Sequence, residues 1–230
     1  MRKLFIAQKG QEEFEKGMSF YQVKKAAEQG DAEAQINLGV CYAIGDGVSQ
    51  DDKQAVYWFK KAAEQGYAEA QYDLGFRYAI GVGVIQDIKK AVYWYEKAAE
   101  QGDAVAQYAL GDCYANGDGV SKDIKKAVYW WEKAAEQGDA WAQYALGNCY
   151  YKGERVSQDY KQAVYWYEKA AEQGDHKAQY ALAFCYANGY GVSKDIKKAK
   201  YWYEKAAEQG DASARYMLER LVEEEFLNED

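Results

Sequence analysis

Apolar and polar positions recur along this chain with a period of 36 residues, without insertion or deletion. The string Ala-Ala-Glu-Gln-Gly marks the period, beginning at Ala26, Ala62, Ala98, Ala134, Ala170 and Ala206. In the period 103–138, Ala106, Leu110 and Tyr114 stand at four-residue steps, so they share one face of a helix. A second apolar face follows, made of Ala127, Trp130, Trp131, Ala134 and Ala135. Each period therefore predicts two helices, here over 104–115 and 124–137, with the Tyr-Trp pairs of the second helix interpreted as core.

Capping residues and glycines mark where these helices begin and end. Asp103 and Asp123 precede the two helices, where a carboxylate can accept hydrogen bonds from free backbone N–H groups of the first turn. Gly117 and Gly138 follow the helices, and glycine readily adopts the left-handed conformation that ends a helix. The period is therefore a helical hairpin. Since one hairpin cannot bury its own apolar face, we expect the hairpins to stack into an all-α solenoid.

The period divides the chain into five full units between two partial ones. The full units, called repeats 1 to 5, are 31–66, 67–102, 103–138, 139–174 and 175–210. An open solenoid needs end units that present a polar outer face. We therefore expect residues 1–30 to form an N-terminal half-repeat and 211–230 a C-terminal capping helix.

Specific side chains are expected to cover the two ends. The covering residues are predicted to be Phe14, Phe20 and Tyr21 at the N-terminal end, and Leu218 and Leu221 at the C-terminal end. The outward residues of the last helix are predicted to be Glu219, Glu223 and Glu224.

The recurring residues resemble the Sel1-like repeat, a relative of the tetratricopeptide repeat with a longer loop. In repeat 3 the pattern is Ala106-x3-Leu110-Gly111-x2-Tyr114-x2-Gly117-x-Gly119-Val120-x2-Asp123-x2-Lys126-Ala127, then Tyr129-Trp130 and Lys133-Ala134-Ala135. The resemblance covers roughly 31–210 and recurs five times in register. It implies a right-handed α/α superhelix of helix-turn-helix repeats and an adaptor or scaffold role. It does not name a partner.

Four positions of the first helix differ from repeat to repeat, whereas its other positions barely change. They are spaced i, i+4, i+7 and i+11 and fall within an arc of about 60°, here called the variable stripe. A face that is free to vary is not core, and the first helices of such solenoids line the concave surface that usually binds the ligand. Aromatic side chains among polar groups are typical of a peptide-binding groove. The candidate binding residues on the stripe are Asp73, Phe76, Ile80, Asp112, Asn116, Trp141, Asn148, Phe184 and Asn188.

Arg77 joins these candidates because it replaces a cysteine found in the other four repeats. An arginine can bind a carboxylate through two hydrogen bonds. The alternative stays open that the stripe is exposed to solvent and that its residues vary because no ligand binds there. It explains Trp141 and Phe184 least well, because large aromatic side chains clustered on one exposed surface usually mark a contact.

The charge and the apolar content of the chain limit the kinds of partner that it is expected to bind. The net charge is −8 and the sequence pI is about 5.0, which disfavours a nucleic-acid ligand. No apolar run approaches the ~20 residues of a membrane span, so a membrane partner is not expected. The first apolar run ends at Ala7, short of the roughly 7–15 residues of a signal peptide. We therefore expect a cytoplasmic protein.

The chain has few residues that could form a disulfide, bind a metal ion or act as a catalytic nucleophile. Cys41, Cys113, Cys149 and Cys185 share one repeat position, and stacked hairpins separate such positions by roughly 8–10 Å, too far for a disulfide. His176 is the single histidine, so no metal site is predicted. The four loop serines that recur before the second helix fit turns rather than nucleophiles: Ser49, Ser121, Ser157 and Ser193. We expect no catalytic residue and no cofactor.

The sequence leaves two main classes of function open. The first is a non-catalytic scaffold that binds a protein or peptide, such as a bacterial regulatory, effector or toxin-immunity protein. The second is a hydrolase acting on a cell-wall-type or β-lactam substrate, for which no nucleophile or acid–base pair stands out. An artificial consensus repeat without a ligand is a further alternative, disfavoured by the variation along the stripe.

Two positions depart from the repeat in a way that predicts lower stability. Tyr67 stands where the other full repeats have a capping Asp, and Arg155 where they have Gly47, Gly83, Gly119 or Gly191. If the latter position requires a positive φ, an arginine there stores about 1–2 kcal/mol of strain.

Arg155→Gly is therefore expected to raise the melting temperature, by about 2–4 °C for each kcal/mol relieved. Thermal unfolding followed by circular dichroism measures the change. An unchanged or lower melting temperature would show that the loop does not need glycine at this position.

Overall fold

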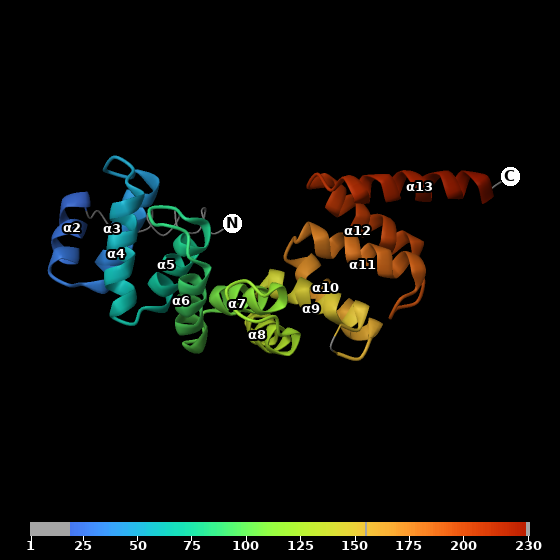
Figure 1. Ribbon diagram of the computed structural model, residues 1–230. Helices are drawn as coiled ribbons and strands as arrows, with labels where there is room; N and C mark the ends of the chain where they lie inside the picture. The colour runs from blue at the N-terminus through green and yellow to red at the C-terminus, as the bar shows by residue number, and fades with distance from the viewer. Residues whose placement is uncertain (1–18, 155, 229–230) are drawn as a thin grey trace. The chain divides into compact units, whose positions relative to one another are not determined.

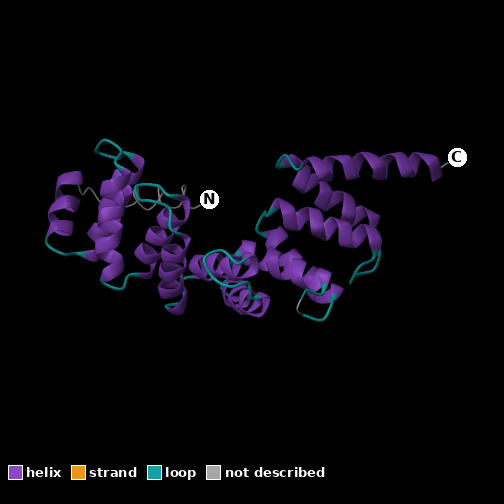
Figure 2. Ribbon diagram, in the orientation of Figure 1, coloured by secondary structure: helices purple, strands orange, loops and turns teal. Residues whose placement is uncertain are grey.

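The computed structural model describes residues 19–154 and 156–228, and over these ranges the chain is helical with no strand (Figures 1 and 2). The helices up to residue 116 are α2 (Phe20–Glu28), α3 (Ala32–Ile44), α4 (Asp52–Glu64), α5 (Ala68–Ile80), α6 (Ile88–Glu100) and α7 (Ala104–Asn116). The later helices are α8 (Ile124–Glu136), α9 (Ala140–Lys152), α10 (Tyr160–Glu172), α11 (His176–Asn188), α12 (Ile196–Glu208) and α13 (Ala212–Asn228). Two helices per period are thus confirmed.

The chain forms two compact units, each made of consecutive helices. The first ends at Lys122 and contains α2 to α7; the second begins at Asp123 and contains α8 to α13. Within each unit every helix packs against the next helix in the chain. The first helices of repeats 1 and 2 are α3 and α5, paired with the second helices α4 and α6; in repeats 4 and 5 the pairs are α9–α10 and α11–α12.

Capping explains the sharp ends of the helices, as the sequence predicts. The Asp103 carboxylate accepts a hydrogen bond from the Ala106 N–H at 2.7 Å, and Asp123 accepts from the Lys125 N–H at 3.0 Å. The first helices then end at glycines in the left-handed region, such as Gly117 at φ 86°. These bonds satisfy backbone groups that the helix itself leaves free.

The loop glycine that Arg155 replaces does adopt positive φ in the other repeats. The values are 67° at Gly47, 76° at Gly83, 72° at Gly119 and 71° at Gly191. A Cβ at Gly83 would also collide with the backbone carbonyl of Asp52 in α4. Arg155 itself lies outside the described residues.

Small residues let the two helices of a hairpin approach closely. The repeated leucine of each first helix is fully buried, as are two alanines seven residues apart on each second helix, for example Leu146, Ala163 and Ala170. A glycine on the first helix faces an aromatic ring of the second: a Cβ on Gly75 would lie 2.9 Å from the Tyr95 ring. The core therefore sets small residues on one helix against large ones on its partner.

A buried glutamine connects each hairpin to the one before it. The Gln71 side-chain amide donates to the backbone oxygen of Ala63 at the end of α4, at 3.1 Å, and the Gln101 amide donates in turn to Gln71 Oε1 at 2.7 Å. The first of these bonds recurs from Gln35, Gln107, Gln143 and Gln179. The same carbonyl oxygens also accept a backbone bond from the glycine three residues on, as Ala63 does from the Gly66 N–H at 3.0 Å, so each glutamine adds a second bond at a helix end.

The Tyr-Trp pairs of the second helices correct one prediction. Their tyrosines are not core, because each is about half exposed: Tyr57, Tyr93, Tyr129, Tyr165 and Tyr201. Each ring stacks edge-on against the following tryptophan, with centroids 4.9–5.0 Å apart. The next position but one, exemplified by Phe59 and Tyr167, faces the core instead.

The ends agree with the predictions in part. Phe20 packs against the first core, with its ring 5.9 Å from that of Tyr42, whereas Tyr21 is 73% exposed and covers nothing. In α13, Leu221 is buried, Leu218 is half-buried, and the exposed residues include Glu219 and Glu223. Phe14 lies outside the described residues, as does the side chain of Glu224.

The described helices have at most 17 residues, the length of α13. None combines the length and the apolar character needed to cross a membrane.

Tyr67 begins α5 without a side-chain capping bond, unlike Asp103 at the same position of the next repeat. Tyr67→Asp is expected to add about 1 kcal/mol of stability by supplying that bond. The melting temperature should rise by about 2–4 °C. Asp103→Tyr is the matched control and should lower it. If neither substitution shifts thermal unfolding, capping does not limit the stability of these repeats.

Candidate functional site

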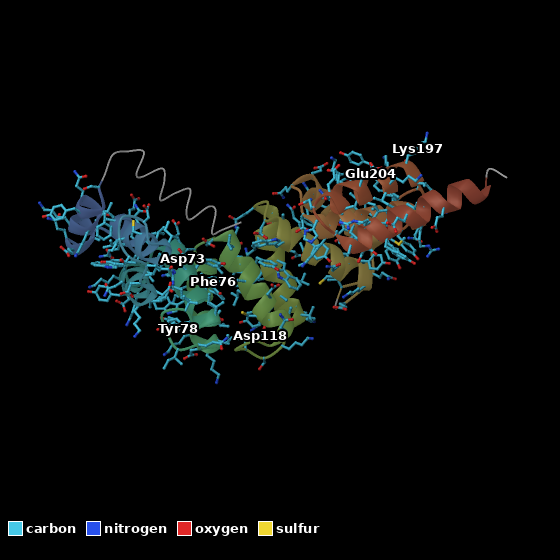
Figure 3. All side chains as sticks on the ribbon, turned by 90° about the horizontal axis from the view of Figure 1, so that it is seen from above. Asp73, Phe76, Tyr78, Asp118, Lys197 and Glu204 are labelled. Atoms are coloured by element: carbon cyan, nitrogen blue, oxygen red, sulfur yellow. The ribbon has the colours of Figure 1, made fainter. Side chains whose placement is uncertain are left out.

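The variable stripe of the first unit is only partly available at the surface. On α5, Phe76 and Ile80 are 44% and 49% exposed, whereas Asp73 is 5% exposed, one turn before Phe76 (Figure 3). On α7, Asn116 is exposed and Asp112 is half-buried.

The prediction that Asp73 lies on an open surface is therefore wrong. In the other repeats the same position holds Asn37, Ala109, Ala145 and Ala181, each of them half-buried. The i+4 position of the stripe thus turns toward neighbouring helices rather than toward solvent. The i+7 and i+11 positions of α5, Phe76 and Ile80, are exposed.

Arg77 forms an ion pair with another residue of the same chain. Its Nη1 lies 3.0 Å from Oδ1 of Asp52 on α4, its guanidinium stacks over the Phe59 ring, and its side chain is 12% exposed. The expectation that Arg77 binds the carboxylate of a ligand is corrected, because the carboxylate it binds is the chain's own.

The Arg77–Asp52 pair is a joint replacement. Where repeat 2 has Arg77, the other repeats have cysteine, and where repeat 1 has Asp52, repeats 2, 3 and 5 have isoleucine and repeat 4 has Tyr160. One junction between hairpins is therefore held by an ion pair at positions that elsewhere carry uncharged side chains.

In the second unit the stripe combines exposed and structural members. Trp141, in the first turn of α9, is 38% exposed. Asn148 accepts a hydrogen bond from the Tyr167 hydroxyl at 2.9 Å, so it helps to join α9 to α10. Asn188 is exposed at the end of α11, where its amide donates to the backbone oxygen of Phe184 at 2.8 Å.

Phe184 belongs to a group of four half-buried rings, here called the aromatic cluster: Tyr151 of α9, Tyr160 of α10, Phe184 of α11 and Tyr190 of the loop that follows. The ring centroids of Tyr160 and Tyr190 are 5.0 Å apart and nearly parallel. Tyr151 lies 5.3 Å from Tyr160, 6.4 Å from Phe184 and 6.0 Å from Tyr190. Phe184 and Tyr190 are 5.9 Å apart.

Three members of the aromatic cluster were not among the candidates drawn from the sequence. Tyr151 stands where the other repeats have alanine, and Tyr190 where they have Asp, Val or Glu. Tyr160 replaces isoleucine or aspartate. These three tyrosines can be found by comparing every position of the repeats, and not only those of the first helix, for an aromatic residue that replaces a non-aromatic one.

The four cysteines are free and buried, as predicted. Burial raises the pKa of Cys149 to about 11 and that of Cys185 to about 12. Both thiols therefore stay protonated near neutral pH, and a protonated thiol is a poor nucleophile.

Two carboxyl groups outside the variable stripe have shifted pKa values. The Lys90 backbone N–H lowers the pKa of Asp87 at the start of α6, and burial raises that of Glu132 on α8. Burial likewise raises the pKa of Tyr151 in the aromatic cluster. Among the described residues no group of three or more His, Cys, Asp or Glu side chains is placed to hold a metal ion. His176 is the first residue of α11.

Comparison with known proteins points to one family. The model of the Sel1 repeat matches residues 32–67, 68–103, 104–139, 142–175 and 176–211. A search of curated proteins found no match.

Several solved bacterial structures are similar. A protective antigen of uropathogenic Escherichia coli with an SLR fold is 40% identical, with a TM-score of 0.85 over 89% of this chain and 44% of that one. A Sel1 repeat protein from Oxalobacter formigenes is 39% identical, with a TM-score of 0.81 over 88% of this chain and 58% of that one. This chain thus spans about half the length of both. These likenesses and the described helices confirm the predicted all-α solenoid.

A more distant likeness carries a functional name. An immunity protein from Pseudomonas aeruginosa is 25% identical, with a TM-score of 0.54 over 82% of this chain and 72% of that one.

A double-mutant cycle tests the Arg77–Asp52 replacement. Arg77→Cys and Asp52→Ile each leave one partly buried charge without its partner, so each is expected to cost about 1–3 kcal/mol of unfolding free energy. The double variant restores the residues of other junctions and is expected to lie within about 0.5 kcal/mol of the original, which gives a coupling energy typical of contacting residues. Urea unfolding measures all four proteins. Additive losses would mean that the two residues do not act as a pair.

Proposed function

Because the chain belongs to the Sel1 repeat family, we propose that it is a non-catalytic scaffold that binds a protein or peptide on the first helices of its repeats. The observation that carries this proposal is the surface of the second unit. There α9 and α11 present Trp141 and Phe184 and, apart from His176, carry no charged side chains other than Lys152 and Lys177.

Such a surface suits recognition better than catalysis. Interfaces draw their energy from a few large aromatic anchors set among polar groups, and both components are present along the stripe. A hydrolase would instead be expected to bring together titratable groups with perturbed pKa values. Of the two shifted carboxyls described above, Asp87 precedes the second helix α6 and Glu132 lies on the second helix α8, so neither belongs to a first helix.

The first unit supplies a smaller exposed set, Phe76 and Ile80 on α5, which the proposal includes as a binding surface of that unit. The exposed asparagines Asn116 and Asn188 add donors and acceptors in the two units. The proposed binding surface also includes Asp112, a half-buried polar residue of the stripe on α7.

The biological setting is proposed from the relatives. Both closely similar structures are bacterial, and one more distant structure is named an immunity protein. We place this chain among bacterial regulatory, effector or immunity proteins. The four free, buried thiols fit a reducing compartment such as the cytoplasm.

The test is a peptide-display selection with the purified chain as bait, followed by affinity measurement of the enriched peptides. Trp141→Ala is expected to weaken their binding about thirtyfold, which corresponds to about 2 kcal/mol for the loss of one anchor. Helicity should stay unchanged, because Trp141 is partly exposed.

Lys125→Ala combined with Lys126→Ala serves as the control, since both lysines are exposed on the second helix α8. This variant should bind as the original does. A selection that enriches no peptide, or a Trp141→Ala chain that binds equally well, would contradict the proposal.

A further inference from the structure

Two asparagines of the chain, Asn116 and Asn188, are each followed directly by glycine. Each is the exposed last residue of a first helix, α7 or α11. Residues 113–121 read Cys-Tyr-Ala-Asn-Gly-Asp-Gly-Val-Ser, and residues 185–193 differ from them only by Tyr190 in place of Asp118. The two asparagines therefore share their sequence context and their place in the repeat.

An asparagine before glycine can lose its side-chain amide without an enzyme. The backbone nitrogen of the glycine attacks the side-chain Cγ, so that a new C–N bond forms and the C–N bond of the side-chain amide breaks. The proton of the attacking N–H leaves with the amide nitrogen as ammonia. Water then opens the cyclic imide at one of its two carbonyls and leaves aspartate or isoaspartate. Glycine permits the attack because it has no Cβ to crowd the nitrogen.

The backbone is arranged in the same way at the two asparagines. The Gly117 N–H donates to the backbone oxygen of Cys113 at 2.9 Å, and the Gly189 N–H donates to that of Cys185 at 2.8 Å. Both glycines adopt positive φ, 86° and 75°. Each attacking nitrogen must therefore give up an equivalent hydrogen bond at a helix end, where helices fray most readily. The backbone does not favour one site over the other.

The side chains of the two asparagines differ in their hydrogen bonds. The Asn188 amide donates to the backbone oxygen of Phe184, four residues earlier, at 2.8 Å. This bond holds the side chain over the preceding turn of α11, whereas the attacking nitrogen belongs to the residue that follows. Asn116 makes no side-chain hydrogen bond or ion pair with the described part of the chain. Its Cγ can therefore turn toward Gly117 without first breaking a bond.

We propose that Asn116 is a site of spontaneous deamidation in the folded protein and that Asn188 is protected by its hydrogen bond to Phe184. The site does not depend on the binding function proposed above.

Conversion of Asn116 places a carboxylate at the C-terminal end of α7, which is the negative end of the helix dipole. Two further carboxyl groups are close in sequence, Asp112 one turn earlier on the same helix and Asp118 in the turn that follows. Isoaspartate also lengthens the backbone by one carbon before Gly117, whose N–H caps the helix. The conversion is therefore expected to weaken the end of α7 and to add a charge to the exposed surface of the first unit.

Peptide mapping by mass spectrometry, after long incubation of the intact chain near neutral pH, measures both conversions. In the folded chain Asn116 should convert about fivefold faster than Asn188, the factor that one neutral hydrogen bond corresponds to. In guanidinium chloride, which removes the bond of Asn188, the difference should disappear. Asn116→Gln should remove most of the acidic form that ion-exchange chromatography separates from the folded chain, and Asn188→Gln, the matched control, should leave that form in place.

Three results would overturn the proposal. The first is conversion of Asn188 in the folded chain at the rate of Asn116 or faster. The second is a difference that persists in guanidinium chloride, because its cause would then be Asp118 and not the structure. The third is conversion of both sites only in guanidinium chloride, which would mean that the bonds of Gly117 and Gly189 protect them equally.

Asn116→Asp, which reproduces one product, tests the consequence for the fold. It is expected to lower the melting temperature followed by circular dichroism, because the new carboxylate opposes the helix dipole. An unchanged melting temperature would contradict the predicted weakening of α7.

Discussion

Each junction between hairpins depends on one buried glutamine at the start of a first helix. The side-chain amide of Gln143, for example, donates a hydrogen bond to the backbone oxygen of Ala135 at the end of the preceding second helix. Its side-chain oxygen accepts a hydrogen bond from Gln173, the glutamine that ends the same hairpin. These polar groups are buried, so leaving any of them unpaired would be costly. The bond fixes which end of one hairpin meets which end of the next, and a constant repeat length keeps that registry along each unit.

The same constraint decides which positions are free to change. Alanine, leucine and glycine are needed where helices touch, and the glutamines are needed where hairpins join. Some variation falls on contacts that are replaced together, as Asp52 and Arg77 stand in place of isoleucine and cysteine. The aromatic cluster is a second replacement of this kind, with Tyr160, Tyr190 and Tyr151 changed in concert.

The third position of the variable stripe also affects the polar groups of the core. In repeat 4, Asn148 accepts the Tyr167 hydroxyl, whereas in repeat 5, where Phe184 takes that position, the Tyr203 hydroxyl is buried without a hydrogen-bond partner. A repeat protein can carry such a local loss because each hairpin is also held by its neighbours.

The periodic sequence by itself determined the helices, their caps and the solenoid class, because these follow from local spacing and from the need of each hairpin to be covered. It also predicted that the side chains of Trp141 and Phe184 are partly exposed. It did not reveal that Asp73 is buried, that Arg77 pairs with Asp52, or that Tyr151, Tyr160 and Tyr190 surround Phe184. Those facts depend on which side chains from different helices meet, and a helical period gives the direction of a side chain on its own helix but not the neighbour it finds.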